Sequence, residues 1–304
     1  MSISFNNGIL EGADAEIFKW IEDNQKVNFN LELKKYYKLF ELLSSLAFKV
    51  LAAKAPTKVL VVGAGEGRVE KKIIDSLNLS AVELWIVDPA EPKIETCDII
   101  SKLHWIKEFV TPERSLTVPT DFDLLVCLGT SRYFHSAVDT YSHLIRHVRK
   151  GGLVVLDFLH LPPMRAATTQ IMGDQFRELW CHNPQTALTL IEDLANISSV
   201  IYDRLSDAST EFRSSTAELG INAGRYSVQQ VIYEVFFPFW CRSGFSRREI
   251  ASQLLWGLMC KNLENPPEKI QSFVAGQSLV AIENLQLNPD TRVIIATKSE
   301  NQES

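Results

Sequence analysis

Three glycines and one aspartate are the residues of this chain whose spacing best suits ligand binding. Gly63, Gly65 and Gly67 occupy every second position directly after an apolar run. Glycines at a turn let backbone N–H groups approach a ligand with no Cβ in the way, and the helix that follows turns the positive end of its dipole toward it. Asp88 ends the next apolar run, where a carboxylate can accept two hydrogen bonds from a ribose. The four residues together predict a site for a ligand that contains a nucleoside.

The glycine pattern differs from the two common glycine-rich fingerprints. The dinucleotide fingerprint GxGxxG has its third glycine one residue further on, where this chain has Arg68. The phosphate-binding loop GxxxxGK[ST] does not occur in the sequence. Arg68 therefore disfavours a nicotinamide oxidoreductase.

Strands and helices alternate around these residues. Continuous apolar runs are typical of parallel strands that are buried on both faces. Helical spacing separates most of the runs, as at 68–77 and 136–149. The alternation predicts an α/β fold with a doubly wound parallel sheet, in which ligands bind at the carboxyl ends of the strands. The strands are predicted at 58–62, 82–87, 122–128 and 153–159, with a weaker candidate at 103–109.

The alternation stops after residue 160. Helical patterns follow, and the chain then closes with two strand patterns whose turn residues predict an antiparallel hairpin. Ser246, with Glu249 three residues later, has the spacing of a helix capping box. The helices are predicted at 164–180, 184–206 and 226–241, and the hairpin strands at 277–287 and 291–297.

Composition limits the classes of function. The 304 residues are 46% hydrophobic and 22% charged, which is typical of a globular protein. The formal charge of −6 disfavours nucleic acid as the main partner. Five dispersed cysteines without a CxxC pair predict reduced thiols, and the sequence shows neither a signal peptide nor a spanning run. We therefore expect a soluble, cytoplasmic protein with no membrane contact and no metal site, since no His/Cys/Asp cluster has ligand spacing.

At this point the chain resembles the class I S-adenosylmethionine-dependent methyltransferases, in particular those that act on small molecules or natural products. The matching segments are 60–67, Asp88, 122–135 and 145–158. The resemblance covers about 35–160 and 245–298, and it implies a Rossmann-like seven-stranded sheet whose last strand is antiparallel. The implied organisation is an N-terminal helical cap at 1–54, a cofactor-binding core at 55–160, a helical lid insert at 161–245 and completion of the core at 246–304.

The resemblance assigns cofactor roles residue by residue. One departure is Val61, since the family often has an acid there that orients the methionine end of the cofactor. The implied contacts are Gly63, Ala64, Gly65 and Gly67 with the methionine part, Asp88 with the ribose, Pro89, Glu108 and Phe109 with the adenine, and Leu128, Gly129 and Thr130 along the transfer site.

Methyl transfer from a sulfonium needs alignment more than acid–base chemistry. The leaving group is a neutral thioether, so most of the catalysis is collinear placement of nucleophile, methyl and sulfur. A base is needed only when the acceptor must lose a proton. The candidate bases are His160, which follows the fifth strand, and His135 and Tyr133, which follow the fourth.

The acceptor is predicted from the helical insert. It contains the aromatic run 233–240, which suits a flat, apolar acceptor, and the N-terminal helices carry Trp20, Tyr36 and Tyr37. We expect methylation of oxygen, nitrogen or carbon of a small apolar or aromatic molecule, by a monomer or homodimer. Two alternatives stay open. One is an RNA or protein methyltransferase, and the other is a non-catalytic methyltransferase-like subunit, which the valine at 61 keeps in consideration.

Overall fold

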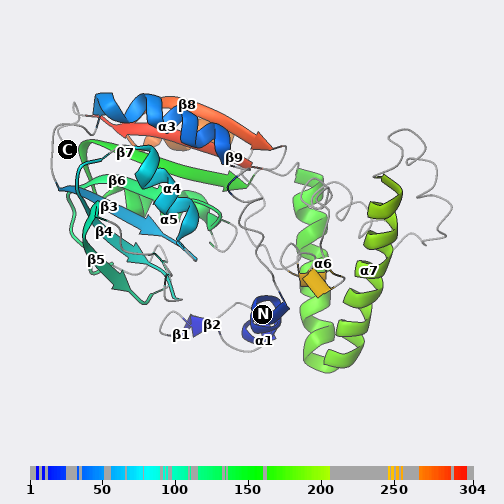
Figure 1. The fold of residues 1–304 in the computed structure, drawn as a ribbon. Helices are drawn as coiled ribbons and strands as arrows, with labels where there is room; N and C mark the ends of the chain where they lie inside the picture. The colour runs from blue at the N-terminus through cyan, green and yellow to red at the C-terminus, as the bar shows by residue number, and fades with distance from the viewer. Residues whose placement is uncertain are drawn as a thin grey trace. The chain divides into compact units, whose positions relative to one another are not determined.

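The structure is a computed structural model, and it divides the chain into two compact units (Figure 1). One unit comprises Met1–Val27 with Leu161–Cys260, and the other comprises Asn28–His160 with Lys261–Ser304. The residues that the structure describes are 5–6, 9–10, 13–24, 33, 36–50, 56–65, 67–77, 79–89, 92, 94, 98–108, 110, 116–131, 134, 136–159, 163–205, 246, 248–249, 251–252, 255, 267–288 and 291–299.

The larger unit is built on a seven-stranded sheet. Strand β9 is antiparallel to both of its neighbours, whereas the other adjacent pairs are parallel. The predicted Rossmann-like sheet with an antiparallel last strand is thereby confirmed. The strand order reverses between β3 and β6, which is where such sheets bind ligands. The spatial order is β5 (Ile100–Ile106), β4 (Val82–Val87), β3 (Thr57–Val62), β6 (Phe122–Cys127), β7 (Val148–Leu159), β9 (Thr291–Lys298) and β8 (Leu279–Asn288).

Helices cover both faces of this sheet. Helices α3 (Tyr37–Val50) and α4 (Arg68–Ser76) contribute to the core on one face, and α5 (Ala137–Ile145) and α12 (Pro267–Gly276) contribute to the core on the other. Every residue of β6 is buried, because its side chains enter the two cores alternately. This double burial explains why the strand, apart from Asp123, is an apolar run in the sequence.

Several element boundaries differ from their predictions; β7, for example, begins at Val148 rather than at 153. Strand pairing explains two of the other differences. Strand β5 begins and ends three residues earlier than the predicted 103–109, because its register is set by β4, where Val87 pairs with Ile106. Helix α5 ends at Ile145 rather than 149, because Val148 already pairs with Phe122 at the start of β7. For β5 and α5, pairing with a neighbouring strand sets the boundary, and the spacing of apolar residues along the chain does not.

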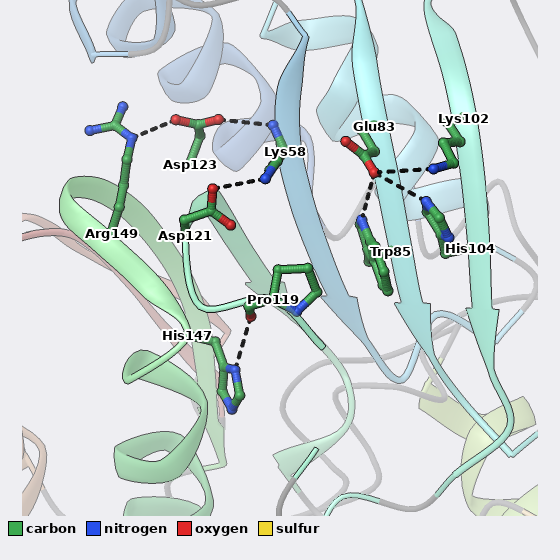
Figure 2. Close-up of polar contacts among 10 residues, drawn as sticks. All are labelled: Lys58, Glu83, Trp85, Lys102, His104, Pro119, Asp121, Asp123, His147 and Arg149. Carbon is green, nitrogen blue, oxygen red and sulfur yellow. Dashed lines mark hydrogen bonds and ion pairs between the residues drawn. The ribbon is translucent and has the colours of Figure 1, made fainter. Parts of the chain in front are cut away.

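The amino ends of the central strands are held by a buried carboxylate (Figure 2). Asp123 is 1% exposed, and it accepts hydrogen bonds from the backbone N–H of Lys58 and from Nε of Arg149. The side chain of Lys58 pairs with the more exposed Asp121 at 2.8 Å. Because Lys58, Asp123 and Arg149 belong to β3, β6 and β7, this ion pair and hydrogen bond fix three neighbouring strands at the end away from the glycine turn.

A second polar cluster lies on the outer strands β4 and β5 (Figure 2). The carboxylate of Glu83 accepts from Nε1 of Trp85 at 3.3 Å and lies 3.1 Å from Nε2 of His104. The rings of Trp85 and His104 are stacked, with centroids 3.8 Å apart. His104 had no role predicted from the sequence. In the structure it helps to join β5 to β4.

The smaller unit is helical. Helix α1 (Ala13–Asn24) contacts α6 (Pro163–His182), and α6 contacts α7 (Pro184–Leu205). Strands β1 (Phe5–Asn6) and β2 (Ile9–Leu10) form a short antiparallel pair that the sequence did not predict. The predicted capping box is confirmed, since Ser246 N–H donates to Glu249 Oε2 at 2.6 Å and Glu249 N–H donates to Ser246 Oγ at 3.3 Å.

The helices predicted at 164–180 and 184–206 are present as α6 and α7. The predicted helix 226–241 lies outside the described residues. The division of the chain at residues 54, 160 and 245, and the role of a lid, stay predictions. Within the described residues, no helix combines the length and the apolar character that crossing a membrane requires.

Candidate functional site

The glycine corner, which we define as Gly63, Gly65 and Gly67, follows β3 directly and precedes α4. All three residues have positive φ, at 73°, 52° and 75°. A Cβ added at Gly63 would lie 2.0 Å from Oγ1 of Thr130, and one added at Gly67 would lie 2.0 Å from Cγ1 of Ile94. A Cβ added at Gly65 would meet nothing within 4 Å. Two of the glycines are therefore required by packing, whereas Gly65 borders open space that a ligand can use.

Asp88 lies beside this corner, at the end of β4. Its carboxylate accepts a hydrogen bond of 2.9 Å from the backbone N–H of Gly65, and the residue is 5% exposed. The indole N–H of Trp105, in β5, donates to the backbone oxygen of Asp88 at 3.0 Å. The aspartate is thus fixed from both sides, and it brings a buried negative charge to the edge of the open space.

A second turn follows β6 and packs against the glycine corner. Gly129 has a φ of 71° and donates its N–H to Oδ2 of Asp157 at 2.8 Å. Oγ1 of Thr130 lies 3.1 Å from the carbonyl oxygen of Leu128 and 3.3 Å from those of Val62 and Gly63, and it can donate its proton to any one of the three. The turn after β6 and the turn after β3 are therefore joined through the threonine.

Asp157 is the residue of this region that the sequence analysis missed. It lies in β7, is 2% exposed, and has a second partner in Tyr141, whose hydroxyl is 2.5 Å from the Asp157 backbone oxygen and 3.2 Å from Oδ1. Burial raises the pKa of Tyr141 well above its usual value, so the phenol stays a donor. The available signal was the single acidic residue inside the apolar run 153–159.

The predicted cofactor residues that the structure describes gather at the carboxyl ends of four neighbouring strands. Ala64 and Leu128 are buried, Pro89 is half-buried, and Glu108 follows the end of β5. The residues brought together in this way are Gly63, Ala64, Gly65 and Gly67 after β3, Asp88 and Pro89 after β4, Glu108 after β5, and Leu128, Gly129 and Thr130 after β6. Phe109 and the candidate bases Tyr133, His135 and His160 lie outside the described residues.

Two further residues bear on the site. The hydroxyl of Tyr36, which is 3% exposed and precedes α3, would lie 3.8 Å from a Cβ added at Gly129. Val61 is packed into the core on the α3 and α4 face, so the position at which the resembling family often has an acid is wholly apolar here. Among the described residues, no group of three His, Cys, Asp or Glu side chains is arranged to hold a metal ion.

The corner suits an adenosyl cofactor on three counts. Gly65 leaves open space beside the backbone of the turn. Asp88 supplies a carboxylate at the tip of the neighbouring strand, and helix α4 begins directly after Gly67. A carboxylate in this place can accept from ribose hydroxyls, and the turns around it are fixed by hydrogen bonds in advance of binding.

Comparisons with known proteins find similar solved structures but no matching sequence family. No protein-family model and no curated protein matches the chain. Among solved structures, the plantazolicin methyltransferase BpumL in complex with SAH is similar at a TM-score of 0.47 and 9% identity, over 94% of this chain and 91% of that chain. The N-methyltransferase NodS from Bradyrhizobium japonicum is similar at a TM-score of 0.40 and 11% identity, over 88% and 98% of the two chains.

A third similar structure is an O-methyltransferase family 2 protein from Planctomyces limnophilus in complex with apigenin. Its TM-score is 0.40 and its identity is 10%, over 92% of this chain and 65% of that chain. At such scores and identities these likenesses assign no activity to the chain. The function has to be inferred from the residues around the glycine corner.

Proposed function

We propose that this chain binds S-adenosylmethionine at the glycine corner and transfers its methyl group to oxygen, nitrogen or carbon of a small organic acceptor. The observation that carries the proposal is the relationship between Gly65 and Asp88. The glycine borders open space, and its N–H is held by a buried carboxylate at the tip of the next strand. Gly65 follows β3, which borders the switch point between β3 and β6, and Asp88 follows β4, the next strand.

Each part of the cofactor would meet a different strand end. Asp88 would accept from the ribose hydroxyls, and the turns after β3 and β6 would enclose the methionine part. The cofactor supplies an activated methyl group as a sulfonium, and the chain supplies alignment and exclusion of water. The residues assigned are Gly63, Ala64, Gly65 and Gly67 to the methionine part, Pro89, Glu108 and Phe109 to the adenine, and Leu128, Gly129 and Thr130 to the transfer side.

The acceptor is proposed to be small and apolar or aromatic, such as a natural-product intermediate. The formal charge of −6 disfavours a polyanionic acceptor, and the aromatic run 233–240 favours a flat apolar one. His160, His135 and Tyr133 remain the candidate bases on sequence grounds, for acceptors that must lose a proton. Nitrogen or activated carbon acceptors would need none of them.

Calorimetric titration with S-adenosylmethionine and with S-adenosylhomocysteine tests the cofactor. We expect saturable binding of one equivalent to the full chain. Gly65→Val should abolish binding by filling the open space, while the far-UV circular dichroism of the sheet stays the same. A wild-type chain that binds neither compound would contradict the enzymatic proposal and favour the non-catalytic subunit.

Transfer of a radiolabelled methyl group then tests the acceptor class. The same preparation is offered phenols, aromatic amines and activated-methylene compounds, and separately RNA and a protein extract. Labelling of a small compound supports the proposal. Label recovered only in RNA or protein would contradict the proposal and favour an RNA or protein methyltransferase.

A further inference from the structure

We infer that Asp157 is a positioning residue of the proposed site, and that its charge favours the cationic cofactor over the neutral product; the inference rests on the proposed function. The carboxylate lies directly behind the turn assigned to the transfer side, where it accepts the N–H of Gly129 at 2.8 Å. Through Thr130, 3.3 Å from the carbonyl oxygen of Gly63, that turn reaches the glycine corner. The carboxylate therefore contacts the backbone of the turn assigned to the transfer side.

No cation compensates this charge within the described residues. The hydrogen-bond partners of the Asp157 carboxylate are the Gly129 N–H and the Tyr141 hydroxyl, and no described lysine or arginine forms an ion pair with it. Asp123 is equally buried at the opposite end of the strands and does have such a partner, Arg149 (Figure 2). A buried carboxylate without a counter-charge lowers stability, so a cation that binds nearby recovers part of that cost.

The thiol of Cys127 lies close enough to Asp157 for the two groups to interact electrostatically. Burial raises the pKa of the Cys127 thiol well above its usual value, and the charge of Asp157 raises it further. Cys127 ends β6, immediately before the turn that Asp157 holds. Asp157 therefore lies close to the end of β6, directly before the turn assigned to the transfer side.

The chemistry of transfer makes this charge selective. When the acceptor lone pair forms its bond to the methyl carbon, the carbon–sulfur bond breaks with its electrons going to sulfur, and the sulfonium becomes a neutral thioether. A fixed anion stabilises the first state and not the second. Val61 in β3, two positions before Gly63, is buried and carries no charge. Asp157 supplies negative charge from β7 instead.

The test compares two ligands rather than one. Dissociation constants of S-adenosylmethionine and S-adenosylhomocysteine are measured by calorimetry for the full-length wild type, for Asp157→Asn and for Asp123→Asn. Asp157→Asn keeps the size and an acceptor for the Gly129 N–H but removes the charge. We expect it to weaken S-adenosylmethionine about tenfold, the order of one screened charge interaction, and S-adenosylhomocysteine less than about threefold. Asp123→Asn, the matched buried control, should leave the ratio of the two constants unchanged.

The outcomes separate this inference from the proposed function. Equal weakening of both ligands by Asp157→Asn, or no weakening, overturns the inference and leaves cofactor binding intact. A wild type that binds neither ligand overturns the proposed function itself. If Asp157→Asn does not fold, Asp157→Ser, with a smaller acceptor for the same N–H, gives the same ratio test.

Discussion

The backbone N–H of Gly65 donates a 2.9 Å hydrogen bond to the carboxylate of Asp88, which joins the turn after β3 to the end of β4. The arrangement recurs on the other side of the switch point, where the N–H of Gly129 donates to Asp157 at 2.8 Å and joins the turn after β6 to β7. In both places a glycine with positive φ is held by a buried carboxylate of the neighbouring strand. Two turns fixed in this way are preorganised for a ligand, since little conformational freedom remains to be lost on binding.

Gly63→Ala should mainly lower the stability of the protein, whereas Gly65→Ala should mainly weaken cofactor binding. The methyl group at 63 would overlap Thr130, including its Cβ at 2.8 Å, so we expect a loss of about 2–4 kcal/mol in the free energy of unfolding from overpacking and positive-φ strain. At 65 the methyl meets no atom, so only strain of about 1 kcal/mol remains. Urea unfolding measures both. Gly65→Ala should instead weaken cofactor binding more than tenfold, and retained affinity would place the ligand elsewhere.

Asp88→Ala should weaken S-adenosylhomocysteine by about 1–3 kcal/mol, the scale of hydrogen bonds to a charged group. The loss would have two sources, the proposed ribose contact and the observed hydrogen bond from the Gly65 N–H. Asp88→Asn retains an acceptor for that N–H, so its affinity should fall between alanine and wild type. Calorimetry checks the order of the three proteins, and unchanged affinity in the alanine variant would exclude Asp88 from the site.

Asp123→Ala should destabilise the sheet without touching the site. Removing this carboxylate leaves Arg149 and the Lys58 N–H without their acceptor, so we expect a loss of about 3 kcal/mol in the free energy of unfolding. Asp121→Ala is the control, because its pair with Lys58 is exposed and worth at most about 0.5 kcal/mol. Urea midpoints distinguish the two variants, and equal midpoints would show that the partly buried ion pair between Asp123 and Arg149 does not hold the strands.

Cys181 should react with iodoacetamide in the native protein at pH 8, whereas Cys127 should not. Cys181 is exposed to the reagent. Cys127 is buried, and burial also raises the pKa of its thiol, so little of the reactive thiolate forms at pH 8. Peptide mass spectrometry of protein alkylated before and after unfolding measures each site. Cys181→Ser provides the control for the assignment, and equal native rates for the two residues would contradict the burial of Cys127.

The sequence by itself determined the succession of elements and the chemical character of the glycine turn. Continuous apolar runs with helical spacing between them identified β3, β4, β6 and much of β7, and turn residues identified the terminal hairpin. These features are local, because burial on both faces and tight turns each impose a composition on consecutive residues. The capping box at Ser246 was visible for the same reason.

Only the tertiary structure decided which glycine borders open space and which carboxylates hold the turns. Gly63, Gly65 and Gly67 are indistinguishable in the sequence, yet Thr130 and Ile94 occupy the space beside two of them. Asp157 lies 28 residues from Gly129, and its hydrogen bond depends on the pairing of β6 with β7, in which Cys127 lies opposite Leu156. Contacts between such distant residues depend on strand register and packing, which no local spacing encodes.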